Sequence, residues 1–257
     1  MDLRMKFNED EKNYDKWRPT YVPELFDKII QYSDINEISK ALEIGIGTGQ
    51  ATLPILKTGS RVIAIEIGEK LAEYSKHKFF AYPNFEIVNV DFESFSSHSQ
   101  TFDLIYSATA FHWISEDIGY NKSFKLLKSG GVLAVFWNHP FVNRQDDLLH
   151  NKIQQVYQKY KAFKGKHPIE FNEKDCDIIL NRMKKYGFSN CQSHVFYSMR
   201  QFTADEYIGL LNTYSDHRAL PKQLKKELEI EISVAINDCG GILKVYDTMD
   251  LYLAQKP

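Results

Sequence analysis

Apolar and polar residues alternate in two different rhythms along the chain. From about residue 40 to residue 138, short apolar runs are separated by longer segments whose apolar residues recur every three or four positions. The short runs predict β-strands, and the longer segments predict α-helices. We expect strands at residues 40–45, 60–68, 84–92, 101–109 and 131–138, and helices at residues 50–59, 69–79 and 120–131.

Two of the predicted strands contain uninterrupted apolar segments, Val62 to Ile65 and Val132 to Phe136. A strand that is apolar on both faces is typical of a parallel sheet covered by helices on both sides. Strands that alternate with helices also favour parallel pairing through helical crossovers. This part of the chain therefore predicts a doubly wound α/β sheet.

The rhythm changes after residue 138. Residues 141–186 and 203–238 show helical spacing, whereas residues 192–202 and 245–256 are typical of strands. Residues 228–236 fit either pattern, and we predict a helix because Leu224, Leu228, Ile232 and Ile236 fall on one helical face. The predicted fold is α/β, with a doubly wound, mostly parallel, seven-stranded Rossmann-like sheet and helical additions over its carboxyl edge.

Three glycines stand two residues apart directly after the first predicted strand, in the segment ALEIGIGTGQ at residues 41–50. Glycine has no Cβ, so a ligand can lie against the backbone, and the start of the next helix offers free N–H groups. Ligands of open parallel sheets bind beyond the carboxyl ends of the strands. We therefore interpret Gly45, Gly47 and Gly49 as part of a ligand site.

The glycine loop departs from two familiar nucleotide motifs. A dinucleotide fingerprint requires a third glycine where Gln50 stands, and the Gly-Lys-Ser/Thr ending of a phosphate-binding loop is absent. Glu66, at the end of the second predicted strand, is placed to accept hydrogen bonds from the two hydroxyls of a ribose. Asp91 and Phe92 end the third, where they offer an acceptor and an apolar surface that suit an adenine ring.

These features occur in order with the segment FDLIYSATAFHWI at residues 102–114, and in this ordered set the chain resembles the class I S-adenosylmethionine-dependent methyltransferases over roughly its whole length. The resemblance implies that S-adenosyl-L-methionine is the cofactor. It implies a cofactor-binding set of Tyr14, Arg18, Glu43, Gly45, Ile46, Gly47, Thr48, Gly49, Gln50, Glu66, Ile67, Asp91, Phe92, Ser107, Ala108 and His112.

The resemblance also implies a role for each part of this set. Glu43 and the backbone from Gly45 to Gly49 would hold the methionine part of the cofactor. Glu66 would bind the ribose, and Asp91 with Phe92 would bind the adenine. Ser107 and Ala108 would line the sulfonium side.

Three further segments look like a bacterial and fungal group of small-molecule methyltransferases that includes trans-aconitate-methyltransferase-like proteins. They are NYDKWRPTYVPEL at residues 13–25, SATAFHW at residues 107–113 and LLNTYSDH at residues 210–217. The resemblance implies that Tyr14, Trp17 and Arg18 fold over the cofactor as a lid. We expect a capping arm at residues 1–39, a cofactor-binding core at residues 40–139, and the remaining strands with a helical substrate cap at residues 140–257, in a single domain overall.

The expected reaction is methyl transfer to a small molecule, and a carboxylate is one acceptor that fits. His112, His217 and Arg18 are the candidate catalytic residues. A carboxylate is already ionised at neutral pH and needs only orientation by such donors. A hydroxyl, amine or carbon acid would instead require His112 or His217 to take up a proton.

Composition narrows the partners. The chain has 32 Lys and Arg against 34 Asp and Glu, a net charge of −2, so we expect no nucleic acid as partner. No apolar stretch is long enough to span a bilayer, and the amino terminus lacks a secretory signal, so we expect a cytoplasmic protein without a membrane partner. The three cysteines and eight histidines lack metal-ligand spacing, and we expect no metal and a monomer or homodimer.

Two other functions remain open on the sequence alone. A protein that binds S-adenosylmethionine without turnover would keep residues 45–91 and fill the acceptor side. An NAD-linked or other nucleotide-linked Rossmann enzyme is disfavoured by Gln50.

Overall fold

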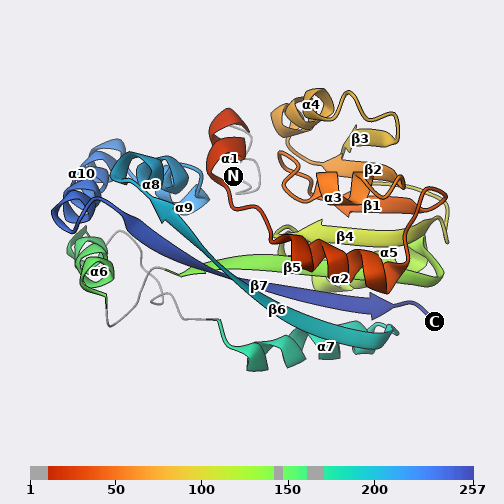
Figure 1. The fold of residues 1–257 in the computed structure, drawn as a ribbon. Coiled ribbons are helices and arrows are strands. Elements are labelled where there is room, and N and C mark those ends of the chain that lie inside the picture. The colour runs from red at the N-terminus through yellow and green to blue at the C-terminus, as the bar shows by residue number, and fades with distance from the viewer. Residues whose placement is uncertain (1–10, 142–146, 161–170) are drawn as a thin grey trace.

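A seven-stranded sheet organises the chain. The computed structural model describes residues 11–141, 147–160 and 171–257 (Figure 1). The strands lie in the order β3-β2-β1-β4-β5-β7-β6, and β7 runs antiparallel to the other six. Their bounds are β1 Lys40–Ile44, β2 Arg61–Glu66, β3 Phe85–Asn89, β4 Phe102–Ala108, β5 Leu127–Phe141, β6 Ser189–Phe202 and β7 Leu243–Gln255. The predicted mostly parallel, doubly wound sheet is confirmed.

Helices cover the sheet and extend beyond its end. They are α1 Glu11–Trp17, α2 Pro23–Ser33, α3 Thr52–Leu56, α4 Glu69–Lys78, α5 Glu116–Leu126, α6 Leu148–Tyr160, α7 Cys176–Lys185, α8 Ala204–Leu211, α9 Ser215–Arg218 and α10 Lys222–Asp238, with short 3₁₀ turns η2 Phe111–Trp113 and η3 Glu173–Asp175. None of the helices within the described residues is both long and apolar enough to cross a membrane. Residues 142–146 and 161–170, inside the predicted helical segment 141–186, lie outside the described residues.

The bounds predicted for the helix over residues 120–131 were wrong. The helix there, α5, begins at Glu116 and ends at Leu126, and β5 begins at Leu127. Leu127 is completely buried and pairs with Phe102 of β4. Strand pairing therefore overrides the helix predicted for residues 127–131.

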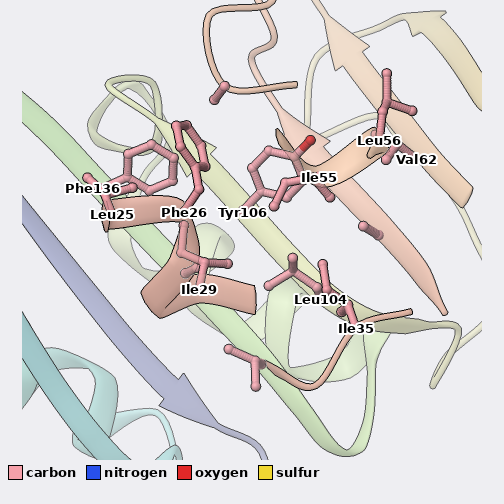
Figure 2. Close-up of a cluster of buried hydrophobic side chains, with 14 of the residues drawn as sticks. Leu25, Phe26, Ile29, Ile35, Ile55, Leu56, Val62, Leu104, Tyr106 and Phe136 are labelled. Carbon is pink, nitrogen blue, oxygen red and sulfur yellow. The ribbon is translucent and has the colours of Figure 1, made fainter. Parts of the chain in front are cut away.

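Two apolar layers enclose the sheet. On one face, Leu25, Phe26 and Ile29 of α2 pack with α3 over the central strands, and Figure 2 shows these side chains gathered beside Tyr106 and Phe136. The opposite face carries α5 and α7. Pro23 begins α2 at a position where its missing N–H costs nothing, and the spacing of the three apolar residues gives the helix one buried stripe.

Beyond the carboxyl ends of the parallel strands, β5, β6 and β7 continue and support a third cluster (Figure 1). Helices α6, α8 and α10 supply most of this cluster, and Leu228, Ile232 and Ile236 of α10 are buried in it. The helix predicted over residues 228–236 is therefore confirmed. These elements stand beside the sheet edge where parallel-sheet ligands bind.

Candidate functional site

A cavity of about 420 Å³ lies at the carboxyl ends of β1 to β4. Its walls come from the loops after these strands, the segment after α1, the end of β5 and the start of α9. The predicted site residues that line it are Tyr14, Arg18, Gly45, Ile46, Gly47, Gln50, Glu66, Ile67, Asp91, Phe92, Ala108 and His112. Residues from four successive strand ends therefore meet at one place, as the parallel topology requires.

The glycine loop serves two purposes. Gly45, Gly47 and Gly49 all have positive φ angles, of 70°, 58° and 82°. A Cβ on Gly45 would lie 2.5 Å from Cβ of Ala110, and one on Gly49 would lie 2.3 Å from the Phe79 ring, so both glycines make room for the protein's own side chains. A Cβ on Gly47 would meet nothing closer than 3.6 Å, from the Tyr14 ring. Gly47 is thus the glycine whose bare backbone faces the cavity without a close protein neighbour.

Glu66 fixes the loop against the second strand. Its Oε2 accepts a hydrogen bond of 2.9 Å from Gly47 N, and its Oε1 accepts one of 2.9 Å from Gly68 N. The side chain is 7% exposed. Burial raises the pKa of Glu66, and the N–H groups of Gly68 and Gly47 oppose this shift because they favour the charged carboxylate.

Asp91 and Phe92 lie side by side on the cavity wall. The Asp91 carboxylate accepts from Ser94 N at 2.6 Å and from Ser94 Oγ at 3.2 Å, so it caps the turn that follows β3. Phe92 is almost fully buried, and Lys122 Nζ lies 5.2 Å from the centre of its ring. The turn geometry holds the carboxylate and the ring at the same edge of the cavity.

Four predicted cofactor contacts lie behind the cavity wall instead of on it: Glu43, Thr48, Gly49 and Ser107. Glu43 is buried and accepts from Thr52 Oγ1 at 2.8 Å and from Tyr106 OH at 2.9 Å. Burial raises its pKa to about 8. Ser107 donates to the Ile44 carbonyl at 2.9 Å. These contacts stiffen the loop, and direct contact with the cofactor stays a prediction.

The segment predicted as a lid bridges the two sides of the cavity. Asp15 accepts from Tyr74 and Lys78 of α4, and Asn13 Nδ2 donates to the Gly209 carbonyl of α8. Trp17 packs against Gly209, with Nε1 only 2.5 Å from the place a Cβ would occupy there. Trp17 therefore anchors the arm to α8 and does not line the cavity.

Arg18 places a cation in the cavity wall. Its guanidinium carbon lies 4.9 Å from the Tyr14 ring centre and 4.6 Å from the Tyr214 ring centre. Nη2 donates a hydrogen bond of 2.8 Å to the Thr213 carbonyl. Two aromatic faces and a carbonyl oxygen hold the guanidinium in one position.

His112 lies on the cavity wall in the turn η2. Trp137 Nε1 donates to His112 Nδ1 at 2.9 Å, which leaves Nε2 as the protonated nitrogen of the neutral ring. Burial, and then the nearby His139, lower the pKa of His112. The imidazole is therefore held neutral, in the tautomer that donates a hydrogen bond from Nε2.

His217 is buried and does not line the cavity. Its Nε2 lies 3.0 Å from Tyr157 OH, and its Nδ1 lies 3.1 Å from Asp216 Oδ1. The three preceding residues, Tyr214 to Asp216, do reach the cavity. The structure thus brings this segment to the site but turns the predicted histidine away from it.

Sequence reasoning missed several residues that line the cavity: Pro19, Tyr21, Thr109, Asn138, Pro140, Tyr214, Ser215 and Asp216. Tyr21 OH and Thr109 Oγ1 are 2.6 Å apart, which ties the arm to the loop after β4. These residues come from segments that are far apart in the chain, and the only signal for them was the resemblance of the segments that contain Tyr21, Thr109 and Tyr214. The described residues contain no group of three or more His, Cys, Asp or Glu that could hold a metal ion.

Comparison with known proteins agrees with this geometry. A model of the methyltransferase domain matches residues 42–135. An rRNA adenine N-6-methyltransferase from Lysinibacillus sphaericus is 34% identical in a match that covers 73% of this chain and 90% of the relative. This chain belongs to the class I S-adenosylmethionine-dependent methyltransferases. It is an enzyme that uses S-adenosylmethionine as its cofactor.

Other relatives of this methyltransferase extend over more of its length. An uncharacterized methyltransferase of Schizosaccharomyces pombe is 24% identical over 90% of this chain and 86% of the relative. The solved phosphoethanolamine N-methyltransferase 2 of Haemonchus contortus, in complex with S-adenosylhomocysteine, matches 99% of this chain and 60% of that chain, with a TM-score of 0.56 and 11% identity. This structural likeness shows a shared fold.

Proposed function

We propose that the glycine loop, Glu66 and the Asp91–Phe92 pair hold S-adenosylmethionine in the cavity. The cofactor supplies a methyl group that its sulfonium makes electrophilic. Gly47 fits this role because its bare backbone lines the cavity beside the start of a helix. Glu66 and Phe92 fit the nucleoside because they present a carboxylate and an apolar ring at neighbouring strand ends.

We further propose that the methyl acceptor is a small organic carboxylate, and Arg18 is the residue on which this assignment rests most heavily. A guanidinium held between two rings is preorganised to pair with a carboxylate through two parallel hydrogen bonds. Asp216 also lines the cavity, but its Oδ1 accepts from His217 N and faces His217 Nδ1. The positive charge that would attract an acceptor anion comes from the Arg18 guanidinium.

His112 suits the same acceptor. A neutral imidazole whose Nδ1 accepts from Trp137 can donate from Nε2 but has no lone pair left to remove a proton. A carboxylate needs a donor to orient it and needs no base, because it is ionised at neutral pH. The chain's contribution to the rate is then alignment and exclusion of water.

A small acceptor is favoured over RNA by charge and by the size of the cavity. A volume of about 420 Å³ falls within the range of about 300–1,000 Å³ that is typical of small-molecule sites. The relative from Lysinibacillus sphaericus is named as an rRNA methyltransferase, but a net charge of −2 gives this chain no broad excess of cations for a phosphate backbone. RNA is therefore the alternative acceptor that the experiment must test.

Release of S-adenosylhomocysteine from S-adenosylmethionine tests the proposal, with small carboxylic acids in one arm and an rRNA transcript in the other. We expect turnover with a carboxylic acid and none with RNA. Arg18→Gln should raise KM for the acid by about tenfold or more, since the charged hydrogen bonds are lost. Arg61→Gln, at an exposed ion pair with Glu86, is the matched control and should leave KM unchanged. Turnover with RNA alone would refute the proposal.

A further inference from the structure

Asn138 of β5 is a buried side chain whose polar atoms have no hydrogen-bond partner within the described part of the chain. It is 9% exposed, and neither Oδ1 nor Nδ2 makes a hydrogen bond with any residue that the structure describes. Buried amides are nearly always paired in folded proteins, because an unmet donor or acceptor lowers stability. An unpaired amide on a cavity wall therefore indicates a group that a ligand satisfies.

The strand arrangement explains why Asn138 stands at the cavity. The pairing of β4 with β5 ends at Ala108 and Phe136. β5 continues to Phe141 with β7 as its partner on the other side. Asn138 comes two residues after Phe136, on the same face of the strand, and it lines the cavity together with Pro140. Asn138 thus lies two residues beyond Phe136, the last residue of β5 that pairs with β4.

The nearby hydroxyls on this side are paired with each other, because Tyr21 OH lies 2.6 Å from Thr109 Oγ1. Asn138 offers a carbonyl acceptor and an NH₂ donor from the same planar group. A carboxylate can satisfy only the donor, whereas a hydroxyl or a carboxamide can satisfy both atoms.

We propose that Asn138 binds a second polar group of the acceptor, a hydroxyl or a carboxamide, while Arg18 binds its carboxylate. This inference rests on the proposed function and narrows the acceptor to hydroxy- or amido-carboxylates. Such a site rejects an analogue that lacks the second group, because the buried amide would again be left unpaired.

Matched acceptors test the inference. Short carboxylates are assayed beside their hydroxylated and amidated counterparts, such as butyrate with 3-hydroxybutyrate and succinamate, by release of S-adenosylhomocysteine. In the wild type we expect kcat/KM to favour a hydroxylated or amidated acid by about tenfold or more. In Asn138→Leu the preference should disappear, while the Kd for S-adenosylmethionine stays unchanged. Turnover with no preference, or a preference that survives in Asn138→Leu, would overturn the inference and leave the proposed function standing. Turnover of no acid in the panel would overturn both.

Thermal unfolding without any acceptor gives an independent readout. Asn138→Leu removes an unpaired amide and should raise Tm by about 2–4 °C. Asn84→Leu is the matched control, because Asn84 Nδ2 donates to the carbonyls of Leu56 and Ser60 at 3.2 and 2.8 Å, and its Tm should fall. A fall in Tm for Asn138→Leu of the same size as for Asn84→Leu would show that the amide is already paired, and would overturn the inference.

Discussion

Alanine substitutions in the glycine loop distinguish three effects: backbone strain at positive φ, a steric clash of the new Cβ with a neighbouring side chain, and the loss of S-adenosylmethionine binding. An alanine at positive φ costs about 1–2 kcal/mol of strain, partly offset by about 0.4–1 kcal/mol from the more restricted unfolded chain. Gly47→Ala should therefore lower the free energy of unfolding by only about 1 kcal/mol, because its Cβ meets nothing closer than 3.6 Å. Gly49→Ala adds a Cβ at 2.3 Å from the Phe79 ring, and overpacking should add a further loss of about 1–3 kcal/mol.

Gly241 supplies the matched control: its φ is 77°, and apart from its chain neighbours no described residue has an atom within 4 Å of the place a Cβ would occupy. Gly241→Ala should cost about as much stability as Gly47→Ala, about 1 kcal/mol, and bind S-adenosylmethionine like the wild type. Gly47→Ala should weaken binding by about tenfold or more, which is about 1.4 kcal/mol. Urea unfolding measures the stability of each variant, and calorimetry measures Kd. Wild-type affinity in Gly47→Ala would refute the idea that the cofactor lies against this backbone.

Three further outcomes follow from the structure. Glu43 has its pKa raised to about 8 when folded, so the stability it contributes is complete below its ordinary pKa and is lost as pH rises through about 8. The Tm of Glu43→Gln should therefore improve relative to wild type from about pH 6 to about pH 9, and a constant difference would contradict this. With a carboxylate acceptor, kcat should stay flat from about pH 6.5 to about pH 9, whereas a rise that follows an imidazole titration would mean that His112 acts as a base. Gly209→Ala should displace Trp17, whose Nε1 would lie 2.5 Å from the new Cβ, and weaken S-adenosylmethionine binding several-fold by calorimetry; unchanged binding would show that the arm is not needed.

Sequence reasoning worked best where local pattern and topology decide the structure. The strands were found because apolar runs of strand length are strong signals, and parallel pairing then brings their carboxyl ends together. Glu66, Asp91 and Phe92 were placed at the cavity for this reason.

Side-chain direction was harder to predict than strand position. Glu43 stands near a strand end, but the alternation along β1 turns it toward the same face as Ala41, where Thr52 and Tyr106 hold it. His217 is a predicted site residue because it can titrate, yet its helix turns it toward Tyr157 and leaves Tyr214 at the cavity. Sequence spacing alone does not reveal which neighbour of a candidate residue reaches a site.

The role proposed for Asn138 could not be predicted from the sequence for a different reason. It depends on how far β5 extends past the end of β4, and that length is set by pairing between segments that are distant in the chain. The arm and α9 likewise meet the strand ends only in three dimensions.

A crystal structure of the enzyme with S-adenosylhomocysteine tests the central claim most directly. The account predicts that the ligand's amino-acid end lies against the Gly47 backbone, its ribose hydroxyls donate to Glu66 and its adenine packs on Phe92, with Arg18 and Asn138 facing the space beside the sulfur. A ligand bound outside this cavity, or one that leaves Glu66 in contact only with the N–H groups of Gly47 and Gly68, would contradict it.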